Sequence, residues 1–293
     1  MTDVTLLDGG MGQELVHRAG DRPTPLWSTQ VMLDHPGLVA EVHRDFTAAG
    51  ATIATTNSYA IHRDRLAGTD LADRFAELHA MAIAEARASG AARIAGSIGP
   101  LAASYRPDLH PDVDTAAPLY TEVASLLAPA CDLLICETVV SLEQARSVLQ
   151  GTADCGRPVW LALSVGDRDG TRLRSGEALA EVLPIAQGRA EAILINCSAP
   201  EAIPAALGIL AGSGLPYGAY ANGFERITED FLKDKPTVDA LQRRRDLTPE
   251  AYAAHALAWV AAGATIVGGC CEVGPAHIAA TARALRDAGH HVT

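Results

Sequence analysis

The chain has 293 residues, of which 48% are hydrophobic and 20% are charged, a composition that excludes an intrinsically disordered protein. Asp and Glu number 35 against 23 Lys and Arg, and the net charge of −12 makes nucleic acid and anionic lipid surfaces poor partners. The N-terminus lacks the basic start and apolar stretch of a secretory signal, and no run reaches the roughly 20 apolar residues of a membrane span, so we expect a cytoplasmic protein.

Short apolar, β-branched runs alternate with Ala-, Leu- and Glu-rich stretches of helical spacing along the whole chain. Eight near-continuous apolar runs, each followed by a helical stretch, favour one closed (β/α)8 TIM barrel over residues 1–293, with its active site at the C-terminal ends of the strands. An open doubly wound sheet is the alternative. The predicted strands are 4–7, 52–55, 93–95, 133–136, 159–163, 192–195, 217–220 and 265–267, and the predicted helices are 37–49, 71–88, 116–130, 178–186, 200–210, 249–262 and 276–288.

Several helix boundaries carry residues with a physical reason to be there. Pro36 and Pro249 fit the first turn of a helix, and Gly50 and Gly263 fit left-handed positions after one. Ser141 begins the spacing of a capping box before a further short helix.

The connection over residues 221–247 is longer than usual and holds clusters of Lys and Arg. Loops of this length are commonly functional or disordered. We interpret it as a solvated, charged excursion, with a lid or a subunit contact as the alternative.

Polar residues and cysteines follow the predicted strands, where the chemistry of a barrel gathers. In chain order these positions are Asp8, Thr56-Asn57-Ser58-Tyr59, Ser97, Glu137-Thr138, Ser164, Asn196-Cys197, Asn222 and Gly269-Cys270-Cys271.

Three cysteines therefore converge on one rim. Only one strand separates the sixth from the eighth around a closed barrel, so Cys197 can face Cys270 and Cys271 although 73 positions separate it from Cys270. Soft thiolates favour zinc, and a catalytic zinc keeps three protein ligands and one open position. The glycines at 268 and 269 would permit close backbone approach and unusual φ angles beside the pair. A redox pair, or small buried hydrophobes, are the alternatives.

The segment from Asp8 to Gly12 contains three glycines and leads into a helix, but it lacks the spacing of a dinucleotide-binding fingerprint. Backbone amides of Met11 and Gly12 at a helix N-terminus suit a carboxylate. Asp8 and Glu137, on nearby rim positions, suit an ammonium group. Together they would bind the zwitterionic end of an amino acid; as isolated residues, the two carboxylates could equally cap helices or form salt bridges.

These motifs together resemble the homocysteine S-methyltransferases over nearly the whole chain. The final block, with its two adjacent cysteines followed by Pro275 and His277-Ile278, is the most specific. The matching blocks are Leu6-Leu7-Asp8-Gly9-Gly10-Met11-Gly12, Thr55-Thr56-Asn57-Ser58-Tyr59, Gly96-Ser97-Ile98-Gly99-Pro100, Cys136-Glu137-Thr138, Ile195-Asn196-Cys197 and Gly268-Gly269-Cys270-Cys271.

The resemblance implies a barrel in which Cys197, Cys270 and Cys271 bind Zn²⁺ and act as the catalytic centre. It places Asp8 and Glu137 at the homocysteine amino group and the amides of Met11 and Gly12 at its carboxylate. Tyr59 matches a tyrosine that fills the open metal position in some members when substrate is absent. Trp27 matches a tryptophan near the onium donor, and Asn222 lies in a block that the family uses at the substrate site.

The implied reaction is zinc-dependent transfer of a methyl group from a sulfonium donor to the thiol of homocysteine, giving methionine. The chain ends at Thr293 without the C-terminal arm of betaine-using members or the folate and cobalamin modules of large methionine synthases. This favours S-methylmethionine, or S-adenosylmethionine, as donor. However, residues 220–224 read Tyr-Ala-Asn-Gly-Phe instead of the Tyr-Pro-Asn-Ser-Gly of S-methylmethionine users.

Several alternatives stay open. The donor could be a betaine or a corrinoid carried on a separate protein, and the acceptor could be another thiol. Outside this reaction, the thiolates could form a closed structural or storage zinc site in a binding protein, or a vicinal-disulfide oxidoreductase. The sequence does not decide between a monomer and a homodimer.

Overall fold

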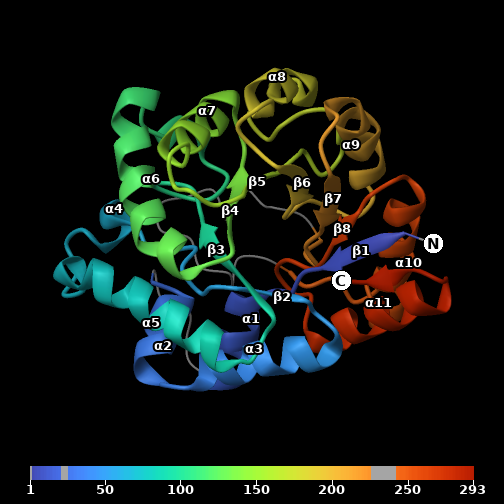
Figure 1. Cartoon of the computed structure of the whole chain (residues 1–293), viewed down its shortest axis with the longest axis horizontal. Coiled ribbons are helices and arrows are strands. Elements are labelled where there is room, and N and C mark those ends of the chain that lie inside the picture. Colours follow the sequence, from blue (N-terminus) through green and yellow to red (C-terminus); the bar gives the residue numbers. More distant parts are fainter. Residues whose placement is uncertain (1, 21–25, 226–241) are drawn as a thin grey trace.

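The computed structural model describes residues 2–20, 26–225 and 242–293. A parallel sheet of nine strands lies at the centre of the molecule, and the helices surround it (Figure 1). The strands are β1 Asp3–Leu6, β2 Ile53–Thr55, β3 Arg93–Ile98, β4 Leu133–Val139, β5 Val159–Leu163, β6 Ala192–Asn196, β7 Tyr217–Tyr220, β8 Ile266–Val267 and β9 His291–Val292.

The α-helices follow the strands in the alternating order that the sequence predicts, with two further helices before β2. They are α1 Met11–Ala19, α2 Ser28–Asp34, α3 Leu38–Ala49, α4 Arg63–Leu66, α5 Phe75–Ala88, α6 Val113–Leu127, α7 Leu142–Gly151, α8 Leu183–Ala186, α9 Ile203–Leu210, α10 Pro249–Ala261 and α11 Pro275–Asp287. Short 3-10 helices occur at Ala72–Arg74, Pro107–Leu109, Ala128–Ala130, Leu179–Val182 and Ala211–Ser213. None of the described helices is long and apolar enough to cross a bilayer.

The sheet is curled, and its strand order is sequential from β2 to β8, followed by β1 and β9. This order differs from that of a doubly wound sheet, in which the strand order reverses at mid-sheet. The end of β1 and the start of β2 meet at an isolated parallel bridge between Leu7 and Ile53, beside which the Thr52 amide donates to the Leu6 carbonyl at 2.7 Å. The sequence did not predict β9, a two-residue strand that pairs with β1 beside the C-terminus.

Both faces of the strands are buried, which explains why the strand sequences are apolar without alternation. In β6, Ala192 and Leu194 belong to an inner cluster enclosed by the sheet, whereas Ile193 and Ile195 belong to the larger cluster under the helices. Cys136 also lies in the outer cluster, whereas its neighbour Glu137 lines the cavity on the opposite face of the strand. Of the cysteines outside the rim, Cys131 and Cys136 are buried and Cys155 is partly exposed.

The predicted helix boundaries are mostly confirmed. Pro249 is the first residue of α10, and Gly50 ends α3 with a φ of 113°. Gly263 has a φ of 96°, and the Ser141 hydroxyl accepts from the Gln144 amide at 3.1 Å. The expectation for Pro36 was wrong: it precedes α3, because Gly37 caps this helix with a φ of 90°. Residues 226–241 of the predicted excursion lie outside the described residues.

Candidate active site

A cavity of about 790 Å³ lies at the C-terminal ends of the strands. Nine of the ten predicted site residues line it, namely Asp8, Met11, Gly12, Trp27, Tyr59, Glu137, Cys197, Cys270 and Cys271. Asn222 does not line it. The Asn222 side chain is buried, and its Oδ1 accepts from the Phe224 amide at 3.2 Å, so it shapes the turn after β7.

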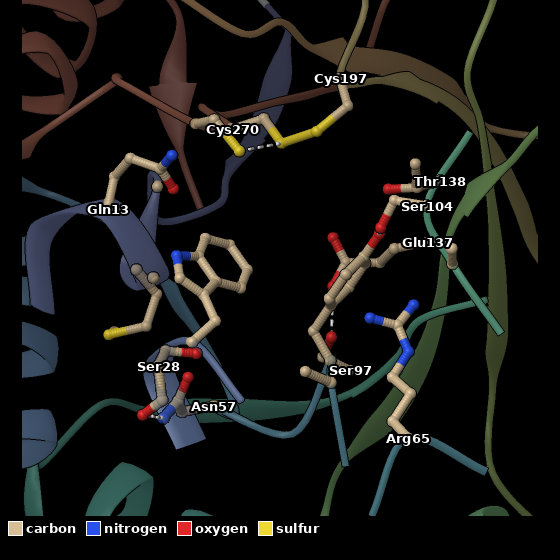
Figure 2. Close-up of a pocket in the computed structure, with 18 of the residues that line it drawn as sticks. Gln13, Ser28, Asn57, Arg65, Ser97, Ser104, Glu137, Thr138, Cys197 and Cys270 are labelled. Carbon is tan, nitrogen blue, oxygen red and sulfur yellow. Dashed lines mark hydrogen bonds between the residues drawn. A yellow bond between two sulfur atoms is a disulfide. The ribbon is translucent and has the colours of Figure 1, made fainter. Parts of the chain in front are cut away.

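The three cysteines of the rim form one cluster, with their sulfur atoms within 4.8 Å of one another. Cys197 and Cys270 are joined by a disulfide, and the Cys271 sulfur lies 3.9 Å from that of Cys270 (Figure 2). In a tetrahedral zinc site with bonds of about 2.3 Å, sulfur atoms are about 3.8 Å apart. The distance between Cys270 and Cys271 fits two thiolates on one metal ion, and binding through all three sulfurs requires the disulfide to be reduced.

Backbone hydrogen bonds at the end of β7 hold Cys197 and Cys270 beside each other. The Cys197 amide donates to the Tyr220 carbonyl at 3.2 Å, and the Cys270 amide donates to the adjacent Ala221 carbonyl at 2.9 Å. Cys197 has a φ of 46°, which is uncommon for a residue with a side chain. The strand that separates the two rim segments therefore also sets the distance between them.

Glycines allow the N-terminal motif and the double-cysteine segment to touch. A Cβ on Gly10 would lie 2.6 Å from the Cys270 carbonyl oxygen, and one on Gly269 would overlap the Val273 side chain. The close approach expected at positions 268 and 269 is therefore confirmed. Their φ angles are not in the positive range, however, so these glycines are required for space and not for backbone conformation.

Arg174, on the segment after β5, supports the Cys197 backbone. Its Nη2 donates to the Cys197 carbonyl at 3.1 Å and to Asp167 at 2.7 Å, and its Nε donates to the Ser164 hydroxyl at 2.9 Å. The Ser164 hydroxyl itself donates to the same carbonyl at 3.1 Å. This largely buried ion pair fixes the carbonyl of a residue whose backbone is strained.

Two buried carboxylates face the cavity. Asp8 accepts from the Thr55 amide at 2.6 Å and from the Thr55 hydroxyl at 2.8 Å, and Glu137 accepts from Ser97 at 2.5 Å and Tyr220 at 3.0 Å. Burial raises the pKa of Asp8 to about 7, against the lowering effect of the Thr55 hydrogen bonds and with a further rise from the charge of Glu137. Burial also raises the pKa of Glu137.

No charged side chain among the described residues neutralises these carboxylates. Among the described residues, the basic group within ion-pair distance of Asp8 is His43, whose Nδ1 lies 3.9 Å from Asp8 Oδ2. Burial lowers the pKa of His43 to about 3, so the ring is neutral at physiological pH. Asp8 and Glu137 therefore favour a cationic ligand, because a positive charge between them would stabilise the ionised forms of both carboxyl groups.

A β-bulge in β4 lies directly beside Glu137, which lines the cavity. The pairing with β5 shifts register between Cys136 and Val139, and Thr138 within the bulge has a φ of 57°. Asn196 holds this residue on both sides, because its Oδ1 accepts from the Thr138 amide and its Nδ2 donates to the Thr138 hydroxyl, each at 3.0 Å. Asn196 is fully buried.

Two aromatic rings form another wall of the cavity. Trp27 and Tyr59 meet edge to face, with 6.3 Å between ring centroids. Trp27 lies directly over Gly12, where a Cβ would come within 2.5 Å of the indole. The Tyr59 hydroxyl lies 2.7 Å from the Ser104 hydroxyl, on the opposite side of the cavity from Gln13 (Figure 2). The faces of such rings attract cations.

The N-terminus of α1 offers hydrogen-bond donors beside the aromatic wall. The Met11 amide donates to the Gly9 carbonyl at 2.8 Å, whereas the amides of Gly12 and Gln13 donate to no described residue. The side-chain amide of Gln13 is also buried without a partner among the described residues, and it projects into the cavity on the side of Cys270 (Figure 2).

The sequence did not single out Gln13, Arg65 or Tyr220 as site residues. Tyr220 ends the seventh predicted strand, so its position at the rim was a usable signal. Gln13 and Arg65 belong to helices whose orientation toward the cavity depends on tertiary packing, and no local pattern marks them.

The chain matches the homocysteine S-methyltransferase family over residues 5–285. It is 32% identical to the homocysteine S-methyltransferase of Escherichia coli, with 95% of this chain and 94% of that protein covered. A selenocysteine methyltransferase of Astragalus bisulcatus is 27% identical, with 92% and 89% covered.

Solved structures of the Escherichia coli homocysteine methyltransferase MmuM share the fold. The metallated form has a TM-score of 0.77 at 30% identity, with 96% of each chain covered. The oxidized form has a TM-score of 0.76 at 31% identity, with 95% of each chain covered. This chain is an enzyme and belongs to the homocysteine S-methyltransferase family.

Proposed function

We propose that this enzyme is a single-domain, closed (β/α)8 barrel that uses zinc to transfer a methyl group from a sulfonium donor to homocysteine, giving methionine. The donor we propose is S-methylmethionine, with S-adenosylmethionine as the second candidate. The observation that carries the proposal is the cluster of three cysteine sulfurs within 4.8 Å, in the same cavity as two uncompensated carboxylates. A cytoplasmic location is part of the proposal, because the thiolates require a reducing compartment.

Asp8 and Glu137 would bind the ammonium group of homocysteine. Both carboxylates are buried and have raised pKa values, so an ammonium ion between them would stabilise their ionised forms. Thr55, Ser97 and Tyr220 already hold their oxygens in place, so little conformational entropy is lost on binding.

The carboxylate of homocysteine would bind at the N-terminus of α1. The backbone amides of Gly12 and Gln13 donate no hydrogen bond to a described residue, so they can bind a ligand. The partial positive charge of a helix N-terminus favours an anion. The Met11 amide is already bonded to Gly9, so we assign Met11 to the cavity wall and not to carboxylate binding.

Cys197, Cys270 and Cys271 would hold the metal through three thiolates. When bound in this way with its fourth position open, zinc supplies a site at which an incoming thiol is kept deprotonated and nucleophilic. Burial raises the pKa of the Cys271 thiol to about 12, so this sulfur becomes a thiolate only when a cation accompanies it.

The remaining residues would position the donor. Trp27 and Tyr59 present aromatic rings to the cavity, and such rings attract a positively charged sulfonium group. The methyl group of the donor would then face the sulfur of homocysteine. Transfer converts the cationic donor into a neutral thioether, so alignment of the two sulfurs and exclusion of water are the contributions required of the protein.

The decisive experiment is a donor panel with purified protein, homocysteine and S-methylmethionine, S-adenosylmethionine or betaine, each carrying a deuterated methyl group. We expect labelled methionine by mass spectrometry from S-methylmethionine, loss of product after zinc chelation, and recovery on adding zinc. Product only from betaine, or only with a second, corrinoid-bearing polypeptide, would contradict the donor. Full activity in protein shown to be free of metal would contradict the zinc site. Selenocysteine should be tested as a second acceptor, because one relative is named for it.

A further inference from the structure

Of the described arginines that line the cavity, Arg65 has no carboxylate within ion-pair distance in the described part of the chain. Arg65 lies on α4, and its guanidinium points toward the centre of the cavity (Figure 2). Its Nη2 donates to the Pro100 carbonyl at 2.8 Å, and its Cζ lies 5.7 Å from the centroid of the Tyr59 ring. Among the described residues, the buried Nε has no partner and Nη1 donates to no atom, while the side chain lines the cavity.

Two neighbouring arginines are paired with carboxylates, unlike Arg65. Arg63, two residues earlier, pairs with Glu122 at 2.6 Å, and Arg106, on the same cavity, pairs with Asp108 at 2.7 Å. Asp64 also lines the cavity, but its oxygens accept from the amides of Arg65 and Ala102. No described carboxylate lies within ion-pair distance of the Arg65 guanidinium.

Homocysteine, the proposed methyl acceptor, would not contact the Arg65 guanidinium. In the proposed function, the ammonium and carboxylate groups of homocysteine are bound by Asp8, Glu137 and the α1 N-terminus. Arg65 lies instead beside Tyr59, which with Trp27 forms the wall assigned to the onium group of the donor. An accessible guanidinium next to a cation-binding aromatic wall suits a ligand that carries both a positive onium and a carboxylate.

We propose that Arg65 binds the carboxylate of the methyl donor, and that the enzyme therefore selects onium donors that bear a carboxylate. This inference rests on the proposed function and extends it to the donor class. It favours an amino-acid sulfonium over a donor without a carboxylate, such as a simple trialkylsulfonium. Arg65 acts here as a specificity-determining residue, because it contacts the donor away from the reacting methyl group.

The test compares S-methylmethionine with its primary amide, which keeps the sulfonium and ammonium groups but lacks the carboxylate. Binding of each to the zinc-loaded protein is measured by calorimetry, and steady-state kinetics are measured in parallel. The variants are Arg65→Gln and Arg65→Lys, and the matched control is Arg63→Gln, which removes the same charge from the same helix on the exposed face.

We expect Arg65→Gln to weaken S-methylmethionine binding and raise its KM by about 10- to 100-fold, the usual loss for a charge-assisted hydrogen bond. Arg65→Lys should restore part of the affinity. The amide should bind the wild type weakly and be unaffected by the substitution, while the KM for homocysteine and the Arg63→Gln control stay within about twofold of wild type.

Equal losses for S-methylmethionine and its amide in Arg65→Gln would overturn the inference, since a residue that merely supports Tyr59 and the Pro100 loop would give that result. Unchanged binding of both ligands would also overturn it. These outcomes are distinct from failure of the proposed function, in which the wild type produces no methionine from any sulfonium donor. The calorimetric comparison still decides the role of Arg65 in that case.

Discussion

Substitution of Asn196 by Ala should weaken both the fold and homocysteine binding. Asn196 is fully buried and makes two hydrogen bonds to Thr138, each at 3.0 Å. Its loss leaves the Thr138 amide buried without a partner, which costs about 1–3 kcal/mol, and removes a second bond worth about 1 kcal/mol. The strained backbone of Thr138, worth on the order of 1–3 kcal/mol, would then relax and recover part of this cost.

We therefore expect the free energy of unfolding of Asn196→Ala to fall by about 2–3 kcal/mol in urea denaturation at neutral pH. The relaxed bulge would also move Glu137, so the KM for homocysteine should rise by about tenfold or more. Ser147→Ala is the matched control, because it removes a 2.8 Å hydrogen bond donated by a buried serine within α7, away from the cavity. A loss of stability in Asn196→Ala with an unchanged KM would refute the idea that this clamp positions Glu137.

Three further predictions concern the site itself. Cys270→Ala should no longer bind one zinc ion per chain, as measured by mass spectrometry, and its rate of methyl transfer should fall at least about 1,000-fold. The control variant Cys155→Ala should keep both zinc and activity. Activity in zinc-free Cys270→Ala protein would disprove the ligand assignment. The folded-state pKa of Asp8 is raised to about 7, so ionisation of this carboxyl lowers the free energy of unfolding as the pH rises from about 4 to 7. The stability gained by Asp8→Asn should therefore grow across that pH range, and homocysteine binding should be lost. A difference in melting temperature that does not change with pH would contradict this. Tyr220→Phe removes a 3.0 Å hydrogen bond to Glu137 and should raise the KM for homocysteine by about 3- to 10-fold with little effect on the donor KM, which steady-state kinetics would check.

The strands and the convergence of the cysteines could be predicted because they depend on local patterns. Continuous apolar runs mark strands buried on both faces, and a cysteine directly after such a run must lie at the rim. Cys197, Cys270 and Cys271 needed only this rule and the order of the strands. Because adjacent side chains of a strand point to opposite faces, Glu137 lines the cavity while Cys136 packs under the helices.

Features that depend on the register between strands could not be predicted. The bulge at Thr138 exists only relative to β5, and nothing in the sequence of β4 marks it. The short strand β9 forms only because β1 offers it an edge. Asn222 follows a strand as the other rim residues do, but its side chain bonds to the turn after β7 instead of lining the cavity.

The end of β6 supports both parts of the proposed homocysteine site, namely the ammonium subsite at Glu137 and the metal-binding cysteines. Asn196 holds the bulge beside Glu137, and the next residue, Cys197, has a positive φ and lies against Cys270. The Cys197 amide and carbonyl are fixed by β7 and Arg174, so a change at position 196 is transmitted through a backbone with little freedom. The distance between the ammonium subsite and the metal-binding sulfurs is therefore set by two consecutive residues. For this reason zinc retention and homocysteine affinity should decline together in variants of Asn196, whereas changes to either carboxylate should affect homocysteine affinity alone.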